Sequence, residues 1–438
     1  MEIDKTTLAD LVIFDREDEF SIFNKINFTN TSRGKEQLRL NLLNPLPDIA
    51  SIKNVQQTIG FIRDKKQHWP QIISNGTIMV VEKFFESNID PIPYNPSSVA
   101  AFSYKLLHGH DYNLVKYSTK HCFDFLKGMQ QAVAFYLNDE TPQPLKKQLE
   151  NAQAILNKPI INILCERPKA SKLTSPEVLD LAHFIKYKYK LNMQDLLAIF
   201  GKLDAWYGMA MAVENFNLCM PTFLHDDLPN VQATNLYHLL LENPVSYNVT
   251  LNQATNFLFL TGANMAGKST FIKAAGTAVY LAHTGMGVPA TNMQLSFFDG
   301  ILSNINVIDN IAKGESYFFN EVQRIKATVQ KVTDGKKWLI LIDELFKGTN
   351  VQDAMKCSST VIEGLLKIKQ SIFVLSTHLY EIGDELKVHP NISFNYFETS
   401  VIDDQLSFSY QLKEGISNDR LGYLILKREG VVGMLEDI

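Results

Sequence analysis

Residues Gly262–Thr270 read GANMAGKST and directly follow the apolar run Phe257–Leu260. An apolar strand followed by G-x-x-x-x-G-K-[ST] is the pattern of the phosphate-binding loop of nucleoside triphosphatases. A glycine-rich turn can direct successive backbone N–H groups into one concavity, and the N-terminus of the following helix adds positive potential. The motif therefore predicts a strand–loop–helix unit in which Lys268 contacts the phosphates and Ser269 holds a magnesium ion.

The loop residues themselves form the predicted nucleotide-binding site. The alternative is an ordinary glycine turn between a strand and a helix, but a chance match at every fixed position of the motif is uncommon at average residue usage. We therefore expect nucleotide contacts from Gly262, Ala263, Asn264, Met265, Ala266, Gly267, Lys268, Ser269 and Thr270.

Composition limits the class of protein. The 438 residues suffice for two or three domains, and 45% hydrophobic with 20% charged residues is typical of a soluble globular protein. The net charge of −5 argues against coating nucleic acid through bulk positive charge, so any DNA contact needs a local patch or a closed ring. Apolar runs such as Trp338–Ile342 are too short to span a bilayer, the N-terminus has no leader pattern, and the cysteines form no C-x-x-C pair. We therefore expect a cytoplasmic setting and no membrane partner.

From about residue 231 short apolar runs alternate with helical patterns, which is typical of an α/β domain with a mostly parallel sheet. The expected strands are residues 256–260, 295–304, 337–342 and 371–376. The expected helices are residues 268–284, 317–333, 351–367 and 418–427, with a hairpin at 401–411. The sequence thus predicts a P-loop ATPase domain over residues 231–438.

Residues 1–230 form a predicted, mainly α-helical domain. Ser32–Leu43 and Ser175–Asn215 carry apolar residues at three- and four-residue spacing, as helices with one buried face do. Residues 69–168 give no clear assignment.

Two acidic residues follow the apolar run 337–342. Asp343 and Glu344 would lie at the carboxyl end of a buried parallel strand, where such sheets place their ligands. We expect Asp343 to hold Mg²⁺ together with Ser269, and Glu344 to orient and deprotonate the attacking water. The alternative is a solvated acidic turn, which the preceding loop motif disfavours.

Two further elements fit the same site. The apolar run 371–377 ends in His378, which could sense or polarise the γ-phosphate or its water, with a structural histidine as the alternative. The segment Asp309–Glu321 opens a helix at Gly314–Ser316, and a helix start presents N–H groups to an anion. The alternative is a plain helix cap made by Ser316.

In order and spacing, several of these segments resemble the ATPase domain of MutS-type DNA mismatch repair proteins. They are TGANMAGKST, DNIAKGES followed by Tyr-Phe, LILIDELFKGTN and LSTH. The pair Asn264–Met265 is typical of MutS loops. Thr31–Ile49 is similar to the start of the MutS core (lever) domain, and Tyr410–Gly433 to the segment that closes the ATPase domain. The resemblance covers residues 10–65 and 195–435.

The resemblance implies a composite ATP and Mg²⁺ site built by two subunits of a homodimer. Gly314 and Ser316 would then reach the partner's γ-phosphate, and Thr349 would lie at the subunit boundary. Asn264 would contact the γ-phosphate of its own subunit, and Asn248 would contact the adenine.

The sequence departs from the MutS pattern at several positions. Ala263 and Ala266 stand where proline and glycine are usual. Alanine is tolerable only at negative φ, so Ala266 is expected to tighten or slow the site. Tyr317 stands for a threonine, and Val245 for an aromatic residue near the adenine, which puts base stacking in doubt.

No mismatch-reading domain is expected before the core motif, which begins within the first few dozen residues. Phe84 and Glu86 have the form of the family's phenylalanine–glutamate wedge, but core packing plus a solvated acid is the preferred interpretation. Tyr187 and Tyr189 alternate with lysines from Lys186 onward, a pattern that could bind DNA. An exposed helix face with buried tyrosine rings is preferred.

The resemblance implies a function in which MgATP hydrolysis in the dimer is coupled to DNA binding, in mismatch repair or related processing of duplex or branched DNA. The alternative is an ATP-gated factor that binds DNA junctions or assembles protein partners without recognising mismatches. A transporter-type ATPase is disfavoured because the LSGGQ signature is absent.

Overall fold

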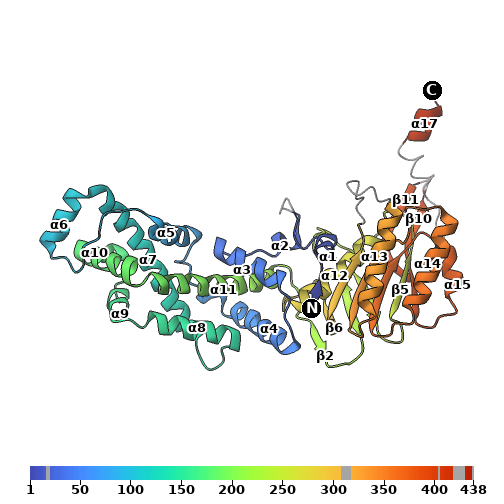
Figure 1. Ribbon diagram of the computed structural model, residues 1–438, viewed down its shortest axis with the longest axis horizontal. Coiled ribbons are helices and arrows are strands. Elements are labelled where there is room, and N and C mark those ends of the chain that lie inside the picture. The colour runs from blue at the N-terminus through green and yellow to red at the C-terminus, as the bar shows by residue number, and fades with distance from the viewer. Residues whose placement is uncertain (16–19, 307–316, 403–404, 418–429, 437–438) are drawn as a thin grey trace. The chain divides into compact units, whose positions relative to one another are not determined.

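The computed structural model describes residues 1–15, 20–306, 317–402, 405–417 and 430–436 (Figure 1). The chain forms two compact units. An α/β unit comprises Met1–Lys25, Asn44–Ile52 and Phe216–Ile438, and a helical unit comprises Ile26–Leu43 and Lys53–Asn215. This division differs from the predicted boundary near residue 230, because Met1–Lys25 and Asn44–Ile52 belong to the α/β unit.

The main sheet of the α/β unit is parallel except at one edge, and the predicted mixed α/β fold with a parallel-rich sheet is confirmed. Its strand order is β1-β7-β8-β9-β5-β10-β11, and among the described strands of this sheet the one antiparallel pair is β10 with β11. The strands are β1 (Glu2–Ile3), β7 (Gly300–Asn304), β8 (Trp338–Asp343), β9 (Ser371–Ser376), β5 (Phe257–Thr261), β10 (Ile392–Ile402) and β11 (Gln405–Glu414).

Helices cover both faces of this sheet, which is why its central strands are almost continuously apolar. On one face, alternate residues of β8 such as Ile340 and Ile342 pack in a buried cluster with Ile362 and Leu365 of α14. On the other face, α12 contacts β8 and β9. The helices that follow β5 in the chain are α12 (Lys268–His283), α13 (Tyr317–Val332), α14 (Val351–Leu365), α15 (Glu381–Leu386) and α17 (Val431–Glu436).

A second sheet has the order β2-β6-β3-β4. Its strands are β2 (Thr222–Leu224), β6 (Asn292–Ser296), β3 (Val231–Leu236) and β4 (Tyr247–Leu251). The prediction of one strand over 295–304 is therefore wrong, because β6 and β7 belong to different sheets. Between them the N–H of Phe298 bonds to the ring of His283, and the N–H of Asp299 bonds to Lys337, so the backbone changes partners there.

The N-terminal residues are part of the α/β unit. Strand β1 pairs in parallel with β7, with Glu2 opposite Gly300 and Ile3 opposite Ile301. Helix α1 (Lys5–Asp10) follows, capped by Asp4, whose Oδ1 accepts the N–H of Thr7 at 2.7 Å. A short helix α2 (Ile22–Lys25) completes the segment.

The helical unit is made of helices throughout, including the stretch 69–168. Its elements are α3 (Ser32–Leu43), the later part of α4 (Ile49–Asp64), η1 (Lys66–His68), α5 (Asn75–Glu86), α6 (Ser98–Leu107), α7 (Gly109–Tyr136), α8 (Gln143–Leu156), α9 (Pro159–Cys165), η2 (Ala170–Lys172), α10 (Ser175–His183), η3 (Phe184–Lys188) and α11 (Lys190–Asn215). The predicted helix 175–215 is thus three consecutive elements, with a π-helical turn at η3.

A buried carboxylate joins α11 to the start of α3. Asp204 is fully buried, and its oxygens accept the N–H groups of Asn30 at 3.0 Å and Thr31 at 2.9 Å and the Thr31 hydroxyl at 2.6 Å. Helix α11 is long and apolar enough to cross a membrane by length and composition alone, but 72% of its most apolar window is buried, as in the core helix of a soluble protein.

The aromatic and basic residues around η3 serve packing. The Tyr189 ring is buried and its hydroxyl donates to Ile155 O, while Lys186 Nζ donates to Phe84 O at 2.7 Å and Ser87 O at 3.0 Å. Tyr187 is half-exposed. These contacts favour packing over a DNA-binding stripe at Lys186 and Tyr189, whereas the Tyr187 ring is not buried as expected.

Candidate active site

The loop between β5 and α12 takes its shape from three residues in the left-handed region. These are Gly262 with φ 134°, Met265 with φ 68° and Gly267 with φ 111°. A Cβ atom at Gly262 would lie 3.1 Å from the carbonyl oxygen of Phe397, so glycine also allows a close approach of β10. Ala266 lies outside the left-handed region, and its methyl group therefore adds no backbone strain to the loop.

Lys268, the first residue of α12, is buried beneath the loop. Its Nζ donates to Gly262 O at 2.7 Å and to Ala263 O at 2.9 Å. Burial lowers the pKa of Lys268 to about 8; Asp343 opposes the shift and Lys347 adds to it. An anion bound at the loop would stabilise the protonated form of this buried amine and raise its pKa.

Ser269 and Asp343 meet at the carboxyl edge of the sheet. Ser269 Oγ donates to Asp343 Oδ2 at 2.5 Å, and Asp343 Oδ1 accepts a hydrogen bond from the hydroxyl of Ser376. Asp343 ends β8 and is paired in register with Ser376, which ends β9. Hydroxyl and carboxylate oxygens are the donor set that Mg²⁺ prefers, so these residues fit that ion.

Glu344 is the next residue and has a left-handed φ of 64°. Its N–H donates to Ser376 O at 2.9 Å, which continues the pairing of β8 with β9 by one residue. Glu344 Oε1 lies 2.7 Å from His378 Nε2, and Oε2 lies 3.0 Å from Lys347 Nζ. The carboxylate is therefore held between two side chains at the cavity.

His378 is a neutral partner of this carboxylate. Burial lowers its pKa to about 4; Lys268 adds to the shift, while Asp343 and the backbone of Gly262 oppose it. At neutral pH the contact with Glu344 is thus a hydrogen bond from an uncharged ring rather than an ion pair.

These side chains line one cavity of about 540 Å³, so the structure brings together loop residues and acids that are far apart in sequence. Of the predicted loop residues 262–270, Gly262 and Ala266 are absent from the lining. The lining residues are Leu241, Asn243, Val245, Tyr247, Ala263, Asn264, Met265, Gly267, Lys268, Ser269, Thr270, Asp343, Glu344, Lys347, His378 and Tyr410.

The structure places Asn248 away from this cavity. Asn248 is exposed on β4, and its Oδ1 accepts the N–H of Asn235 at 3.0 Å. Successive residues of a strand point to opposite faces, so the cavity receives the neighbouring Tyr247 instead. The expected contact of Asn248 with the adenine does not fit this placement.

The remaining predicted residues lie elsewhere. Thr349 lines a second, smaller cavity of about 280 Å³ that also contacts Glu344 and His378. Gly314 and Ser316 lie outside the described residues, as does the predicted helix 418–427.

Five cavity residues were missed by sequence reasoning: Leu241, Asn243, Tyr247, Lys347 and Tyr410. Tyr247 contacts Phe271 edge-on, with ring centroids 5.3 Å apart. It lies two residues after Val245, the position at which the resemblance leads one to expect an aromatic residue near the adenine. Tyr410 lies on β11, and its position depends on the pairing of β10 with β5, which no local pattern reveals. The only local indication for Lys347 is that it lies three residues after Glu344, close enough for their side chains to meet.

Comparison with known proteins gives the family. Residues 258–432 match the family model of MutS domain V. The chain is similar to the DNA mismatch repair protein MutS of Petrotoga mobilis, with 26% identity over 265 residues that cover 59% of this chain and 32% of that protein. It is also similar to the DNA mismatch repair protein MutS of Lactobacillus helveticus, with 31% identity over 201 residues that cover 44% of this chain and 23% of that protein.

A third relative is the DNA mismatch repair protein MutS of Leuconostoc mesenteroides, with 30% identity over 256 residues that cover 56% of this chain and 30% of that protein. The matched part is thus a third or less of the length of each of these relatives. Residues 258–432 thus carry a domain of the MutS family, and the similarity to MutS proteins extends over about half of the chain.

Proposed function

We propose that this protein is a MutS-like ATPase that binds and hydrolyses MgATP at the cavity beside the loop 262–267. The observation that carries the proposal is the convergence of Lys268, Asp343 and Glu344 on that one cavity. A buried cation, a serine–aspartate oxygen pair and a second carboxylate at the cavity are the parts that phosphoryl transfer to water requires.

In this mechanism Lys268 exchanges its two carbonyl partners for the β- and γ-phosphates, whose charge favours the protonated amine. Ser269 and Asp343 would hold Mg²⁺, and the ion would supply positive charge to neutralise the phosphates. Glu344 orients the attacking water and accepts its proton. His378 holds Glu344 through a hydrogen bond and adds no positive charge near neutral pH, because its pKa is lowered to about 4.

We further propose that two copies of the chain complete each site. The segment carrying Gly314 and Ser316 would contact the partner's γ-phosphate, and Thr349 would lie at the boundary between subunits. ATP binding would close the dimer and hydrolysis would reopen it, so that the helical units act as arms around DNA. This action would take place in the cytoplasm, where Cys122, Cys219 and Cys357, all free thiols here, remain reduced.

The proposed partner is duplex or branched DNA, in mismatch repair or related processing. One observation favours the alternative, an ATP-gated junction-binding or assembly factor without mismatch recognition. Phe84, the phenylalanine of the candidate wedge, is 1% exposed in the core of the helical unit and cannot be inserted between bases.

The proposal is tested in two steps on the whole chain. Phosphate release from MgATP should be measurable for the wild type and abolished by Lys268→Ala; no hydrolysis by the wild type, with or without DNA, would refute it. Binding to matched, mismatched and branched duplexes is then compared with and without ATP at a stated salt concentration. Preference for a mispair supports repair, whereas preference for junctions, or no DNA binding, supports the alternative.

A further inference from the structure

Helix α13 carries a buried carboxylate that contacts the loop after Glu344. Glu321 is 5% exposed. Its Oε1 accepts the N–H of Lys347 at 3.1 Å, and its Oε2 accepts the N–H of Gly348 at 3.2 Å. The turn held in this way includes Glu344 and Phe346, both at positive φ. Such conformations persist only where surrounding contacts impose them, and Glu321 supplies two of those contacts.

The same turn also acts on the Glu344 side chain. Lys347, whose N–H is bound by Glu321, places its Nζ 3.0 Å from Glu344 Oε2. A shift of this turn would therefore move both the backbone of Glu344 and one of the two side chains that hold its carboxylate.

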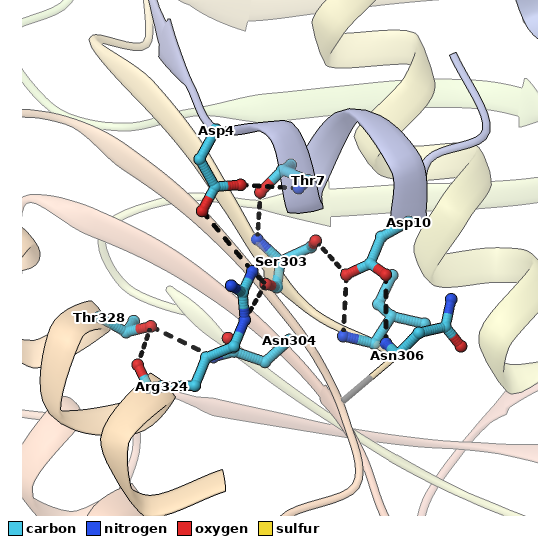
Figure 2. Close-up of polar contacts among 9 residues, drawn as sticks. Asp4, Thr7, Asp10, Ser303, Asn304, Asn306, Arg324 and Thr328 are labelled. Atoms are coloured by element: carbon cyan, nitrogen blue, oxygen red, sulfur yellow. Dashed lines mark hydrogen bonds and ion pairs between the residues drawn. The ribbon is translucent and has the colours of Figure 1, made fainter. Parts of the chain in front are cut away.

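One polar face of α13 makes further contacts with the end of β7. Glu321, Arg324 and Thr328 follow each other at three- and four-residue spacing and so share a face of the helix. Arg324 Nε donates to Ser303 O at 3.2 Å, and Thr328 Oγ1 accepts from Asn304 Nδ2 at 3.2 Å (Figure 2). The helix is thus fixed to β7 along the face that carries Glu321.

The N-terminal segment also binds the end of β7. Asp10 is buried, and its carboxylate accepts the hydroxyl of Ser303 at 2.5 Å and the N–H groups of Ile305 and Asn306, each at 3.2 Å (Figure 2). The N–H of Ser303 donates to Thr7 Oγ1 at 2.9 Å. Every polar group of Ser303 is therefore used: its N–H and hydroxyl bind α1, and its carbonyl binds α13.

We propose that Glu321 is a positioning residue for Glu344. In this proposal Asp10 binds Ser303, Ser303 binds Arg324, and these contacts hold helix α13, which carries Glu321. The inference rests on the proposed ATP hydrolysis. A general base must lie within hydrogen-bond reach of its water, and displacements of about 1 Å can cost on the order of a hundredfold in rate.

The kinetic test separates positioning from nucleotide binding. Glu321→Ala should lower kcat about tenfold or more and leave the Kd for MgATP within about twofold, because the loop 262–267 is untouched. Glu321→Gln keeps one acceptor oxygen and should fall between Glu321→Ala and the wild type. Wild-type kcat in Glu321→Ala, in a protein whose wild type does hydrolyse ATP, would overturn the inference.

A matched control is Asn391→Ala. Asn391 is also a buried polar residue, with its Nδ2 2.9 Å from Asn256 Oδ1, but it precedes β10 at the opposite edge of the sheet from the cavity. This variant should lose stability and keep its kcat. A fall in its kcat equal to that of Glu321→Ala would show that general destabilisation explains both and would also overturn the inference.

A second readout does not need turnover. Amide hydrogen exchange of residues 345–350 should be at least about tenfold faster in Glu321→Ala than in the wild type and unchanged in Asn391→Ala. If the wild type fails to hydrolyse ATP but exchange follows this pattern, the proposed function fails and the structural coupling stands. Equal exchange in all three proteins would refute the coupling itself.

Asp10→Asn tests the N-terminal part. An amide in place of the carboxylate turns its NH₂ group toward N–H donors, so one contact to the end of β7 is lost. Exchange should then increase both at 303–306 and at 345–350, and the loss of kcat should be less than additive with that of Glu321→Ala. Increased exchange confined to 303–306, or strictly additive losses, would remove Asp10 from the proposal.

Discussion

Ser269 Oγ lies 2.5 Å from Asp343 Oδ2, although the two residues are separated by 74 positions in the chain. The contact joins the first turn of α12 to the end of β8. It therefore brings the hydroxyl of one sequence motif and the carboxylate of another to a single point beside the loop 262–267.

A magnesium requirement follows from this pair. Asp343→Asn removes the negative charge and Ser269→Ala removes the hydroxyl, so each variant should need at least about tenfold more Mg²⁺ for half-maximal ATP hydrolysis. Titration of phosphate release with Mg²⁺ at saturating ATP measures this. An unchanged magnesium dependence in both variants would show that the ion is held elsewhere.

The affinity for ATP should depend on pH through Lys268. Its pKa in the free site is lowered to about 8 by burial, while phosphates favour the protonated amine. Below pH 8 the amine is already charged and the Kd should be level; above pH 8 binding must take up a proton, and the Kd should rise by up to about tenfold per pH unit. Calorimetry at pH 7 and pH 9, in buffers of different ionisation enthalpy, measures the proton uptake. A Kd that is constant from pH 7 to pH 9 contradicts the assignment.

Glu344→Gln should separate ATP binding from hydrolysis. Glutamine keeps an oxygen for the contact with His378 but cannot accept a proton from water, so the hydrolysis rate should fall by at least about a hundredfold while ATP still binds. The variant should accumulate as the closed, ATP-bound dimer, which light scattering after size exclusion detects. Normal steady-state turnover would rule out Glu344 as the base.

The stability of the α/β unit should decrease in acid because of His283. The neutral ring is used on both sides: Nδ1 donates to Val279 O at 2.8 Å, and Nε2 accepts the N–H of Phe298 at 2.9 Å. Burial lowers its pKa to about 4, from 6.5 in the unfolded chain. The unfolded chain thus binds the proton first, and the free energy of unfolding should fall by about 2–3 kcal/mol as pH drops from 6.5 to 4.

Denaturant titrations across this pH range provide the measurement. His238, whose pKa is also lowered to about 4 by burial, adds to the slope. His283→Gln should reduce the pH dependence, whereas His110→Ala, which changes a side chain that is 96% exposed, should leave it as in the wild type. The same slope in His283→Gln as in the wild type would exclude His283 as the cause.

Gly300→Ala should destabilise the main sheet. A Cβ atom at Gly300 would lie 2.0 Å from the Trp338 ring, which is buried on the adjacent strand. Overpacking of this kind costs about 1–3 kcal/mol, which urea denaturation resolves. Gly364→Ala is the control, because its Cβ would meet nothing within 4 Å and alanine favours a helix. Equal stability of both variants would mean that the ring of Trp338 can move aside.

Much of the candidate site could be predicted because its residues follow their strands directly. The loop 262–267, Asp343 and His378 each come at or just after the end of an apolar run, and parallel strands bring such ends to one edge. The strand β9 and the starts of α12 and α14 were placed well for the same reason, since local patterns of apolar residues define them.

What could not be predicted depends on pairing between distant segments. Residues 295–304 read as one strand, but β6 pairs with β3 and β7 pairs with β8. Glu321 resembles any acid on an exposed helix until its contacts with Lys347 and Gly348 are known. The pairing of β1 with β7 joins residues that are almost three hundred positions apart, and no local sequence pattern predicts this pairing.

This pairing has a consequence for the nascent chain on the ribosome. Residues 26–215 contain the whole helical unit and can fold early. The hydrogen bond between Asp10 and Ser303 cannot form until Ser303, 293 residues later, has been synthesised. Until α12 is made, Leu11, fully buried in the finished protein, also lacks the helix whose Gly276 it approaches. The segment around Asp10 is thus synthesised well before the residues that it binds, and its apolar side chains require protection from aggregation until those residues are available.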